Sequence, residues 1–526
     1  MNILEGLRRA ATCYPSKTAV IDGEVRYNWR EFDQRTKKLA AGLSNLGIKA
    51  GDSFALLALN SFRYLELHYG ATRLGAKIVP LNIRFSPQEL IYTLNDSESV
   101  ALFVDDMFAP LVEKARSSLP GIQHYLHAGA GATPTGLTSY EAIIENSAGW
   151  ETFQDADLQD EDLVGIFYTG GTTGNPKGVM LTNRNIVSNA MHVTINSRYV
   201  PEDVYLHVAP MFHLADGAST FAITMLGGTH AFLPMFDPIK TLTCIQNNKV
   251  TCMLLVPTMI NALIQVPNIK DYDLSSWRSI LYGASPIPVA VLKKAMQILP
   301  CQFAQGYGMT EAAPLLTGLS SDAHRAGFEA EEGTLAYRRL MSAGQPVPGV
   351  VVRVVNDEMQ DIKPGQVGEV IARGPNIMQG YWKLGKESAY GLRDGWLHTG
   401  DLATIDEDFY VYIVDRAKDM IVSGGENIYS VEVENALYKH PAILEAAVVG
   451  IPDDKWGEKV HAVVVFKSGQ SASEEELIET CREYIGGYKL PRSFEFVEAL
   501  PKSGAGKILK RNLREKYWEG HNRRVN

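Results

Sequence analysis

Apolar residues recur with two different spacings in the first fifth of the chain. Asn28 and Glu31 have the spacing of a capping box, and the apolar residues that follow are Phe32, Leu39, Leu43 and Leu46, at helical intervals. Short apolar runs at 54–59, 78–81 and 100–104 predict buried strands, and residues 64–74 between them predict a helix. This alternation favours an α/β architecture with parallel strands, and it continues past residue 160.

The pattern changes between residues 340 and 414 to short alternating segments with frequent Gly and Pro, such as 350–355 and 367–372. We expect a β-rich subdomain there. A new α/β unit then begins near residue 415, so we divide the chain into a large domain at 1–414 and a small one at 415–526.

The small domain has signals for its own helices and strands. Ser430 is predicted to cap a helix that Pro441 stops, and Ser473 with Glu476 predicts a capping box for a second helix. Apolar runs at 446–451 and 460–466 predict strands between these helices. The unit is complete enough to fold separately.

Composition narrows the functional classes. The chain has 526 residues, 45% hydrophobic and 21% charged, which is ordinary globular usage. A net charge of -10 without a long basic block disfavours nonspecific nucleic-acid binding. The five cysteines are widely spaced and form no C-x-x-C pair, so we expect neither a zinc site nor a disulfide framework.

We expect a cytoplasmic protein. Arg8 and Arg9 precede any apolar stretch long enough for a secretion signal. The most apolar region, 208–236, is interrupted by polar and glycine residues and is therefore predicted to be core, not a membrane span. Peripheral membrane contact and a homodimer stay open.

Residues 168–182 join a strand-like run to a loop rich in Gly and Thr with one lysine, Lys177, which predicts phosphate binding. The Walker pattern is absent because Gly178 follows the lysine, so a kinase or motor NTPase is disfavoured. The segment 129–134 lacks the third glycine of a dinucleotide fingerprint and has no clear strand before it, so a nicotinamide enzyme has no support.

The phosphate loop is one of eight ordered motifs that together resemble the adenylate-forming superfamily of acyl-CoA synthetases, adenylation domains and luciferases. The other seven lie at 209–213, 282–285, 305–311, 396–401, 415–419, 423–427 and 501–507. The family commonly has serine where this chain has Gly170, so we expect rearranged loop contacts without loss of activity.

The resemblance implies an ATP- and acyl-binding large domain and a mobile small domain. In the nucleotide site Tyr307 is similar to the residue that packs on adenine, and Asp401 with Arg416 is similar to the pair that binds ribose. The full set of implied ATP- and AMP-binding residues is Thr169, Gly170, Gly171, Thr172, Thr173, Gly174, Lys177, Gly283, Ala284, Ser285, Gln305, Gly306, Tyr307, Gly308, Met309, Thr310, Asp401, Arg416 and Lys507.

Four residues are implied to act in catalysis: Lys507, Thr172, Lys177 and Glu311. Glu311 and Thr172 are similar to the family's Mg²⁺ ligands, and Mg²⁺ prefers a carboxylate together with substrate phosphates. Lys507 is similar to the mobile catalytic cation that approaches the α-phosphate. ATP, Mg²⁺ and CoA are the implied cofactors and co-substrates.

The resemblance also implies an acyl pocket, a CoA passage and a hinge. The acyl pocket would comprise His213, Ala215, Val256, Gly283, Gly308, Met309, Ala313, Pro314 and Leu315. Gly308 stands where acetate-specific relatives close the pocket with tryptophan, which favours a larger acid. Pantetheine would pass Ser423, Gly424, Gly425 and Glu426, and Lys418 matches the hinge about which the small domain rotates.

The expected activity is therefore an AMP-forming acyl-CoA synthetase that converts a medium- or long-chain fatty acid to acyl-CoA through an acyl-adenylate. Aryl or hydroxycinnamate acids are an alternative, because both branches share these motifs. A freestanding adenylation enzyme that loads a carrier protein is a second alternative, and a nonenzymatic binding paralogue is a third.

Overall fold

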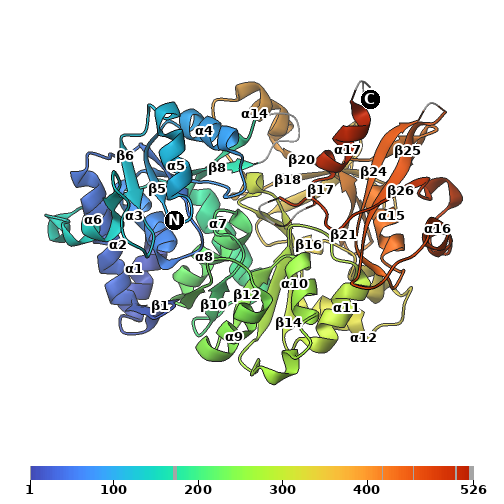
Figure 1. The fold of residues 1–526 in the computed structure, drawn as a ribbon, viewed down its shortest axis with the longest axis horizontal. Coiled ribbons are helices and arrows are strands. Elements are labelled where there is room, and N and C mark those ends of the chain that lie inside the picture. The colour runs from blue at the N-terminus through green and yellow to red at the C-terminus, as the bar shows by residue number, and fades with distance from the viewer. Residues whose placement is uncertain are drawn as a thin grey trace.

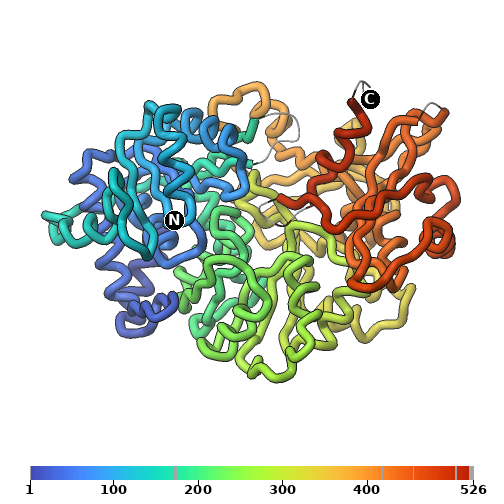
Figure 2. Tube along the Cα trace, viewed as in Figure 1, coloured from blue at the N-terminus to red at the C-terminus, as the bar shows by residue number. Residues whose placement is uncertain are grey.

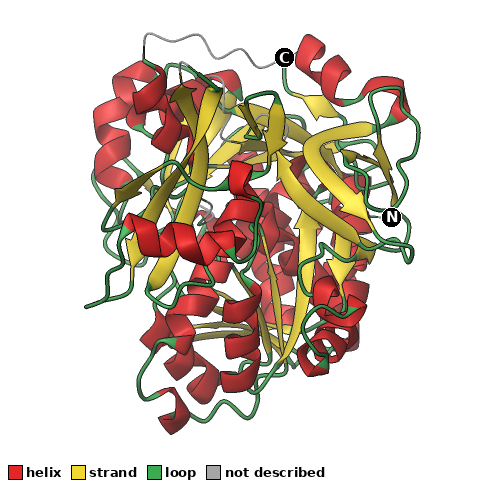
Figure 3. Ribbon diagram, turned by 90° about the vertical axis from the view of Figure 1, so that its right-hand side faces the viewer, coloured by secondary structure: helices red, strands yellow, loops and turns green. Residues whose placement is uncertain are grey.

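In the computed structural model the described residues are 2–169, 175–416, 419–453, 455–503, 506 and 508–519. The described strands form four sheets, and most helices lie on the outside of the sheets (Figures 1 and 3). The first two sheets are mainly parallel and are built from the predicted alternation of helices and strands. The mixed α/β class expected from the sequence is confirmed.

The largest sheet has the strand order β16-β15-β14-β13-β12-β10-β11-β1-β2 in the described part of the chain. Its strands are β1 (Thr18–Asp22), β2 (Val25–Asn28), β10 (Val204–His207), β11 (Thr229–Phe232), β12 (Cys252–Leu255), β13 (Ser279–Gly283), β14 (Gln302–Gly308), β15 (Leu315–Leu319) and β16 (Gln345–Pro346). Strands β10 to β14 run parallel, so their carboxyl ends meet at one edge.

The second sheet has the order β19-β9-β8-β4-β3-β5-β6-β7 among the described strands. Its strands are β3 (Ser53–Leu57), β4 (Lys77–Pro80), β5 (Ser99–Val104), β6 (His124–His127), β7 (Thr138–Ser139), β8 (Leu163–Thr169), β9 (Lys177–Thr182) and β19 (Gly380–Tyr381). The phosphate loop lies between β8 and β9, which pair as antiparallel neighbours. The short strand β19 brings a segment 200 residues later in the chain beside β9.

The other two sheets correspond to the predicted β-rich and C-terminal parts. One has the order β17-β18-β20-β21 and is antiparallel throughout: β17 (Val351–Val355), β18 (Gly368–Arg373), β20 (Leu397–Ile405) and β21 (Val411–Arg416). The other contains β22 (Ile421–Ser423), β23 (Glu426–Ile428), β24 (Ile443–Asp453), β25 (Gly457–Phe466) and β26 (Ser493–Phe496).

Several described helices begin where a short polar side chain accepts a backbone N–H group, as at Asn28, Ser86 and Thr182. The helices of the large part are α1 (Ile3–Cys13), α2 (Trp29–Asn45), α3 (Phe62–Leu74), α4 (Pro87–Asp96), α5 (Ala109–Ala115), α6 (Tyr140–Glu145), α7 (Asn183–Ser197), α8 (Leu214–Leu226), α9 (Pro238–Asn248), α10 (Pro257–Ile264), α11 (Val289–Ile298), α12 (Ser321–Glu329), α13 (Leu335–Arg339) and α14 (Gly385–Gly391). Those near the C-terminus are α15 (Ser430–Leu437), α16 (Glu474–Arg482) and α17 (Lys510–Trp518). The capping boxes predicted at Asn28 and at Ser473 are both confirmed.

Two local predictions were wrong. Ser430 does not cap α15 but is its first residue, and the Asp415 carboxylate accepts both the Ser430 N–H and its hydroxyl, at 2.6 and 2.7 Å. Asp415, 15 residues earlier in the chain, therefore provides the cap that a residue next to the helix usually provides. The segment at 129–134 does follow a strand, β6, which the polar His124 and His127 concealed in the sequence.

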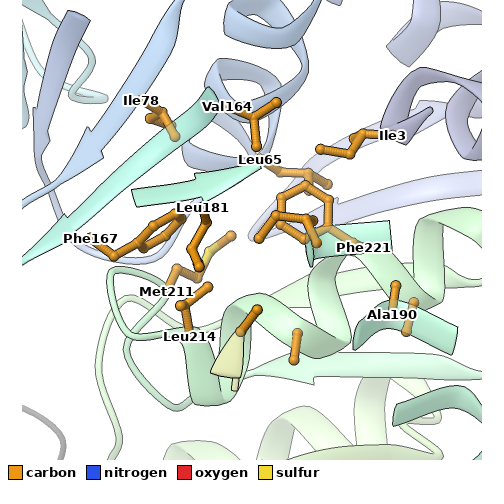
Figure 4. Close-up of a cluster of buried hydrophobic side chains, with 14 of the residues drawn as sticks. Ile3, Leu65, Ile78, Val164, Phe167, Leu181, Ala190, Met211, Leu214 and Phe221 are labelled. Atoms are coloured by element: carbon orange, nitrogen blue, oxygen red, sulfur yellow. The ribbon is translucent and has the colours of Figure 1, made fainter. Parts of the chain in front are cut away.

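The main hydrophobic core lies between the two parallel sheets and the helices that separate them. Figure 4 shows side chains from β8 and β9, such as Phe167 and Leu181, converging on Met211, Leu214 and Phe221 from the region of α8. A further core packs under α15, α16 and the C-terminal sheet. Among the described helices, none is both long and apolar enough to cross a membrane.

The C-terminal part touches the large part at separate points. Residues 501–503 lead from the C-terminal part towards the middle of the molecule (Figure 2). There Arg84 donates to the Ser503 carbonyl at 2.8 Å, and a Cβ added at Gly506 would lie 3.1 Å from Val256. A third contact is the ion pair of Lys439 with Glu332, with 3.0 Å between Nζ and Oε1.

Candidate active site

Three residues implied to bind the nucleotide meet where two sheets adjoin. Tyr307 lies near the end of β14, Asp401 on β20 and Arg416 at the end of β21. The Tyr307 hydroxyl donates to Asp401 Oδ2 at 2.7 Å, and Arg416 Nε lies 3.2 Å from Asp401 Oδ1. The backbone register also pairs Asp401 with Arg416. The structure therefore brings Tyr307 together with two residues that lie more than 90 positions later in the chain.

The part of β20 next to Asp401 is held in place by Glu369. Glu369 on β18 accepts the Gly400 N–H at 3.1 Å and contacts His398 Nδ1 at 2.7 Å. Burial and the neighbouring Asp401 raise the pKa of Tyr307 well above its usual value, so its hydroxyl keeps its proton and donates. Asp401 itself is mostly buried. The carboxylate is thus oriented by fixed donors on two sides.

Glu311 and Lys177 both contact a third residue, Tyr381. The Tyr381 hydroxyl donates to Glu311 Oε1 at 2.8 Å. The Lys177 ammonium lies over the same ring, 5.3 Å from its centroid. Burial and Glu311 raise the pKa of Tyr381 above its usual value, which keeps the hydroxyl a donor.

The loop that carries Glu311 is fixed by buried amides. Asn376 donates to the carbonyls of Ala312 and Leu315 at 2.7 and 2.9 Å. Asn189 on α7 accepts the Leu315 N–H at 2.9 Å, and the Met378 N–H donates to the Glu311 carbonyl at 2.9 Å. Backbone groups that would otherwise be unsatisfied in the interior are therefore paired.

The donors present suit a magnesium ion that is bound together with ATP. No cluster of three or more His, Cys, Asp or Glu side chains in the described residues could hold a metal by protein ligands alone. Glu311 instead offers one buried carboxylate, and only its Oε1 accepts a hydrogen bond from the described part of the chain. One carboxylate plus substrate phosphates is the arrangement that Mg²⁺ prefers.

The implied adenine wall is built from closely packed backbone. Gly283 pairs with Gly306 across β13 and β14, and a Cβ at Gly283 would lie 2.3 Å from the Gly306 carbonyl oxygen. A Cβ at Gly308 would lie 1.8 Å from the Pro314 carbonyl oxygen. Glycine at 308 is therefore required by the neighbouring loop, a reason independent of pocket depth. The other residues implied here lie on or next to these strands: Ala284, Ser285, Gln305, Met309 and Thr310.

Several residues implied to line the acyl pocket belong to one hydrophobic cluster, the main core. Ala313 and Leu315 are buried in it, whereas Ala215, Met309 and Tyr307 are partly buried and pack against it. His213 caps α8, because its Nδ1 accepts the Ala215 N–H at 3.1 Å. Val256 lies just before α10 and faces Gly506. The residues implied to line the pocket are thus mainly apolar, and His213 serves as the N-cap of α8.

The residues implied to guide CoA form the turn between β22 and β23. Gly424 and Gly425 both have positive φ, at 62° and 87°, which explains glycine at both positions. A Cβ at Gly424 would lie 2.6 Å from the Trp456 ring, and the Gly424 N–H donates to the Trp456 carbonyl at 2.8 Å. The turn therefore packs on the loop between β24 and β25, and Ser423 pairs with Gly457 at the start of β25.

Some implied residues lie outside the described part of the chain: Gly170, Gly171, Thr172, Thr173, Gly174, Lys418 and Lys507. Their described neighbours are Thr169 at the end of β8, Arg416 at the end of β21 and Gly506 against Val256. Sequence reasoning missed Glu369, Asn376 and Tyr381. The first two are single polar residues in ordinary surroundings, while Tyr381 follows a glycine at a turn-like position and had no pattern that singled it out.

Comparisons with known proteins agree with the motifs. The AMP-binding enzyme family matches residues 7–382, and the AMP-binding enzyme C-terminal domain matches residues 432–507. A feruloyl-CoA synthase from Amycolatopsis sp is 37% identical over 510 residues, 97% of this chain and 98% of that protein. A fatty acid–[acyl-carrier-protein] ligase from Streptomyces coeruleorubidus is 34% identical over 524 residues, with 97% and 96% covered.

Among solved structures, the anthranilate CoA ligase AuaEII in complex with anthranoyl-AMP superimposes with a TM-score of 0.89 at 27% identity, covering 98% of this chain and 97% of that one. The fold, the order of the motifs and the family matches support the same family assignment. The chain belongs to the AMP-binding enzymes, the adenylate-forming superfamily that contains the acid–CoA ligases.

Proposed function

We propose that the protein activates a medium- or long-chain fatty acid with ATP and transfers the acyl group to CoA. The ATP-binding part of this proposal is supported by the group that Tyr307, Asp401 and Arg416 form. A buried carboxylate with several acceptor lone pairs suits the two ribose hydroxyls, and a guanidinium beside it supplies a fixed cation. The acid carboxylate would attack the α-phosphate, release pyrophosphate and form an acyl-adenylate.

Charge in this first step would be stabilised from two sides. Lys177 and the Thr-rich loop beside it would contact the phosphates, and Glu311 would hold a magnesium ion, which neutralises phosphate charge when bound. Lys507 would add a second cation. Its neighbour Gly506 packs against Val256, which supports the placement of this motif on the acyl side of the site.

In the second step the CoA thiol would displace AMP. We propose that residues 415–526 act as a mobile domain that turns about Lys418 and brings the turn at 423–426 to the site. The hydrogen bond with Arg84 and the ion pair with Glu332 are exposed to solvent, which supports this proposal because such contacts contribute little free energy.

The preference for a fatty acid rests on the apolar side chains expected around the acyl group. Ala215, Met309, Ala313 and Leu315 share one hydrophobic cluster, and His213 is engaged at the start of α8. An aliphatic tail gains free energy by leaving water for such surroundings. Gly308 does not contribute to this preference, since backbone packing alone requires glycine there.

A hydroxycinnamate-type acid is the second candidate. The observation in its favour is the 37% identity to a feruloyl-CoA synthase over 97% of the chain. The identity of 34% to a ligase that charges an acyl-carrier protein keeps the carrier protein as an alternative acceptor.

The test is pyrophosphate release with octanoate, palmitate and ferulate, first without acceptor and then with CoA or a holo-carrier protein. We expect release with a fatty acid and acyl-CoA formation with CoA. Release with ferulate alone would replace the fatty acid by the aryl acid, and product formation only with the carrier protein would replace CoA. Absence of release with every acid would contradict the proposed activity.

A further inference from the structure

Tyr381 contacts both of the charged residues that are implied to act on the phosphates. Its hydroxyl lies 2.8 Å from Glu311 Oε1, and its ring centroid lies 5.3 Å from the Lys177 ammonium. These two residues have opposite charge and would attract one another in a partly buried site. In the described part of the chain no ion pair joins them, and the tyrosine lies in contact with both.

The backbone around Tyr381 is bonded to both sides of the site. Tyr381 pairs with Val179 in the β19–β9 ladder, and the Trp382 N–H donates to the Gly178 carbonyl at 2.7 Å. On the other side the Met378 N–H donates to the Glu311 carbonyl at 2.9 Å. One five-residue segment, 378–382, therefore links the strand that leaves the phosphate loop to the loop of Glu311.

We propose that Tyr381 is a positioning residue for nucleotide binding. Its hydroxyl fixes Glu311 so that Oε2 is presented to a divalent cation that arrives with ATP. Its ring holds the Lys177 ammonium away from that carboxylate, so that the cation stays available to phosphate. The inference rests on the proposed function, since it assumes that ATP binds between these residues.

A tyrosine that only anchors β19 would show different behaviour. Removal of an anchor would weaken ATP binding equally with and without metal. Loss of the orientation of Glu311 would weaken binding only when the metal is present, because metal-free ATP does not use the carboxylate as a ligand. The dependence of ATP affinity on Mg²⁺ is therefore the measurement that separates the two roles.

The experiment compares the wild type with Tyr381→Phe, which keeps the ring over Lys177 and removes only the hydroxyl. Tyr412→Phe is the matched control, because the Tyr412 hydroxyl also donates to a carboxylate, Asp406, at 3.1 Å. Calorimetry would give the dissociation constant of ATP with excess Mg²⁺ and with EDTA. We expect Tyr381→Phe to weaken Mg·ATP binding about tenfold, the effect of losing a hydrogen bond to a charged group, and to leave metal-free binding unchanged.

Equal affinities for Tyr381→Phe and wild type would overturn the inference, and so would equal weakening with and without Mg²⁺. A second variant, Tyr381→Leu, also removes the ring; we expect a further loss of Mg·ATP affinity as Lys177 pairs with Glu311. If Tyr381→Leu bound Mg·ATP no more weakly than Tyr381→Phe, the role of the ring would be refuted.

The two proposals fail in distinguishable ways. A wild type that neither binds ATP nor releases pyrophosphate would refute the proposed function itself. A wild type that does both, with a Tyr381→Phe variant of unchanged metal dependence, would refute only the inference about Tyr381.

Discussion

His324 is a buried residue directly behind the implied adenine wall. Its Nε2 lies 2.8 Å from the hydroxyl of Tyr282 on β13, and its Nδ1 lies 2.8 Å from the Ser320 carbonyl. A carbonyl can only accept, so Nδ1 carries the proton and Nε2 accepts from the tyrosine. Burial lowers the pKa of His324 from 6.5 to about 4, and the bond to Ser320 partly opposes this shift.

This shift predicts a loss of stability in mild acid. Between pH 6.5 and 4 the unfolded chain binds a proton at this histidine and the folded chain does not. Stability from this group is therefore present above pH 6.5 and falls as the pH drops, by up to about 1.4 kcal/mol per pH unit. His324→Gln, which keeps a donor and an acceptor, should remove this one-proton slope.

Urea unfolding midpoints of the two proteins across the same pH range would check this prediction. Other histidines contribute to both curves, among them His192, whose pKa burial lowers to about 4. Only the difference between the curves reports on His324. Curves that stay parallel would show that His324 binds its proton equally in both states.

Helix α8, whose first turn includes Ala215 of the proposed acyl pocket, is held against the large sheet by buried polar groups. Asp216 in its first turn accepts from the Tyr205 hydroxyl at 2.9 Å and lies 2.6 Å from His207 Nδ1. His207 in turn contacts His230 at 2.9 Å, and His230 contacts Thr224 later in α8 at 3.0 Å. The chain of contacts begins and ends on the same helix, so it fixes α8 against β10 and β11.

Asp216→Ala should destabilise the protein by about 3 kcal/mol, because it leaves two buried donors without an acceptor at about 1–3 kcal/mol each. Asp216→Asn retains a carbonyl oxygen and should lose less. Chemical unfolding of the three proteins would give the order wild type, Asn, Ala. If the Ala variant were as stable as the Asn variant, the acceptor role of Asp216 would be excluded.

Local sequence patterns predicted the start of a helix correctly where the capping residue lies next to that helix. The boxes at Asn28 and Ser473 are short-range and could be recognised from four residues. The start of α15 could not, because its cap, Asp415, comes from 15 residues earlier. The Tyr381–Glu311 bond joins residues 70 apart, and nothing in either segment encodes the partner. Ordered motifs singled out the residues that we propose bind the nucleotide, whereas the side chains that orient them are set by tertiary contacts.

At the scale of the whole molecule, charged side chains contribute to the contact between the C-terminal part and the large part. One is the pair of Lys439 with Glu332, whose side chains are 34% and 68% exposed. An exposed pair of this kind contributes about 0.2–1 kcal/mol, so it can bias the arrangement of the two parts without locking it.

Glu332→Lys should therefore slow the pyrophosphate release that requires the carboxylic acid substrate by at most about fivefold. The reason is that like charges would now face each other across the contact. The double variant with Lys439→Glu restores opposite charges and should recover the wild-type rate. Stopped-flow measurement of the first turnover would test both. A double variant as slow as the single one would show that this pair does not bias the arrangement.

The close approach at Gly308 has a practical consequence for redesign. Protein engineers commonly narrow a binding pocket by replacing a glycine in its wall with a larger residue. Here even one added carbon would collide with the Pro314 carbonyl oxygen, so the loop after Glu311 would have to shift. A library that aims to change which carboxylic acid is accepted should therefore keep Gly308 and vary Ala215. The Ala215 side chain is partly buried at the start of α8, against the main hydrophobic core.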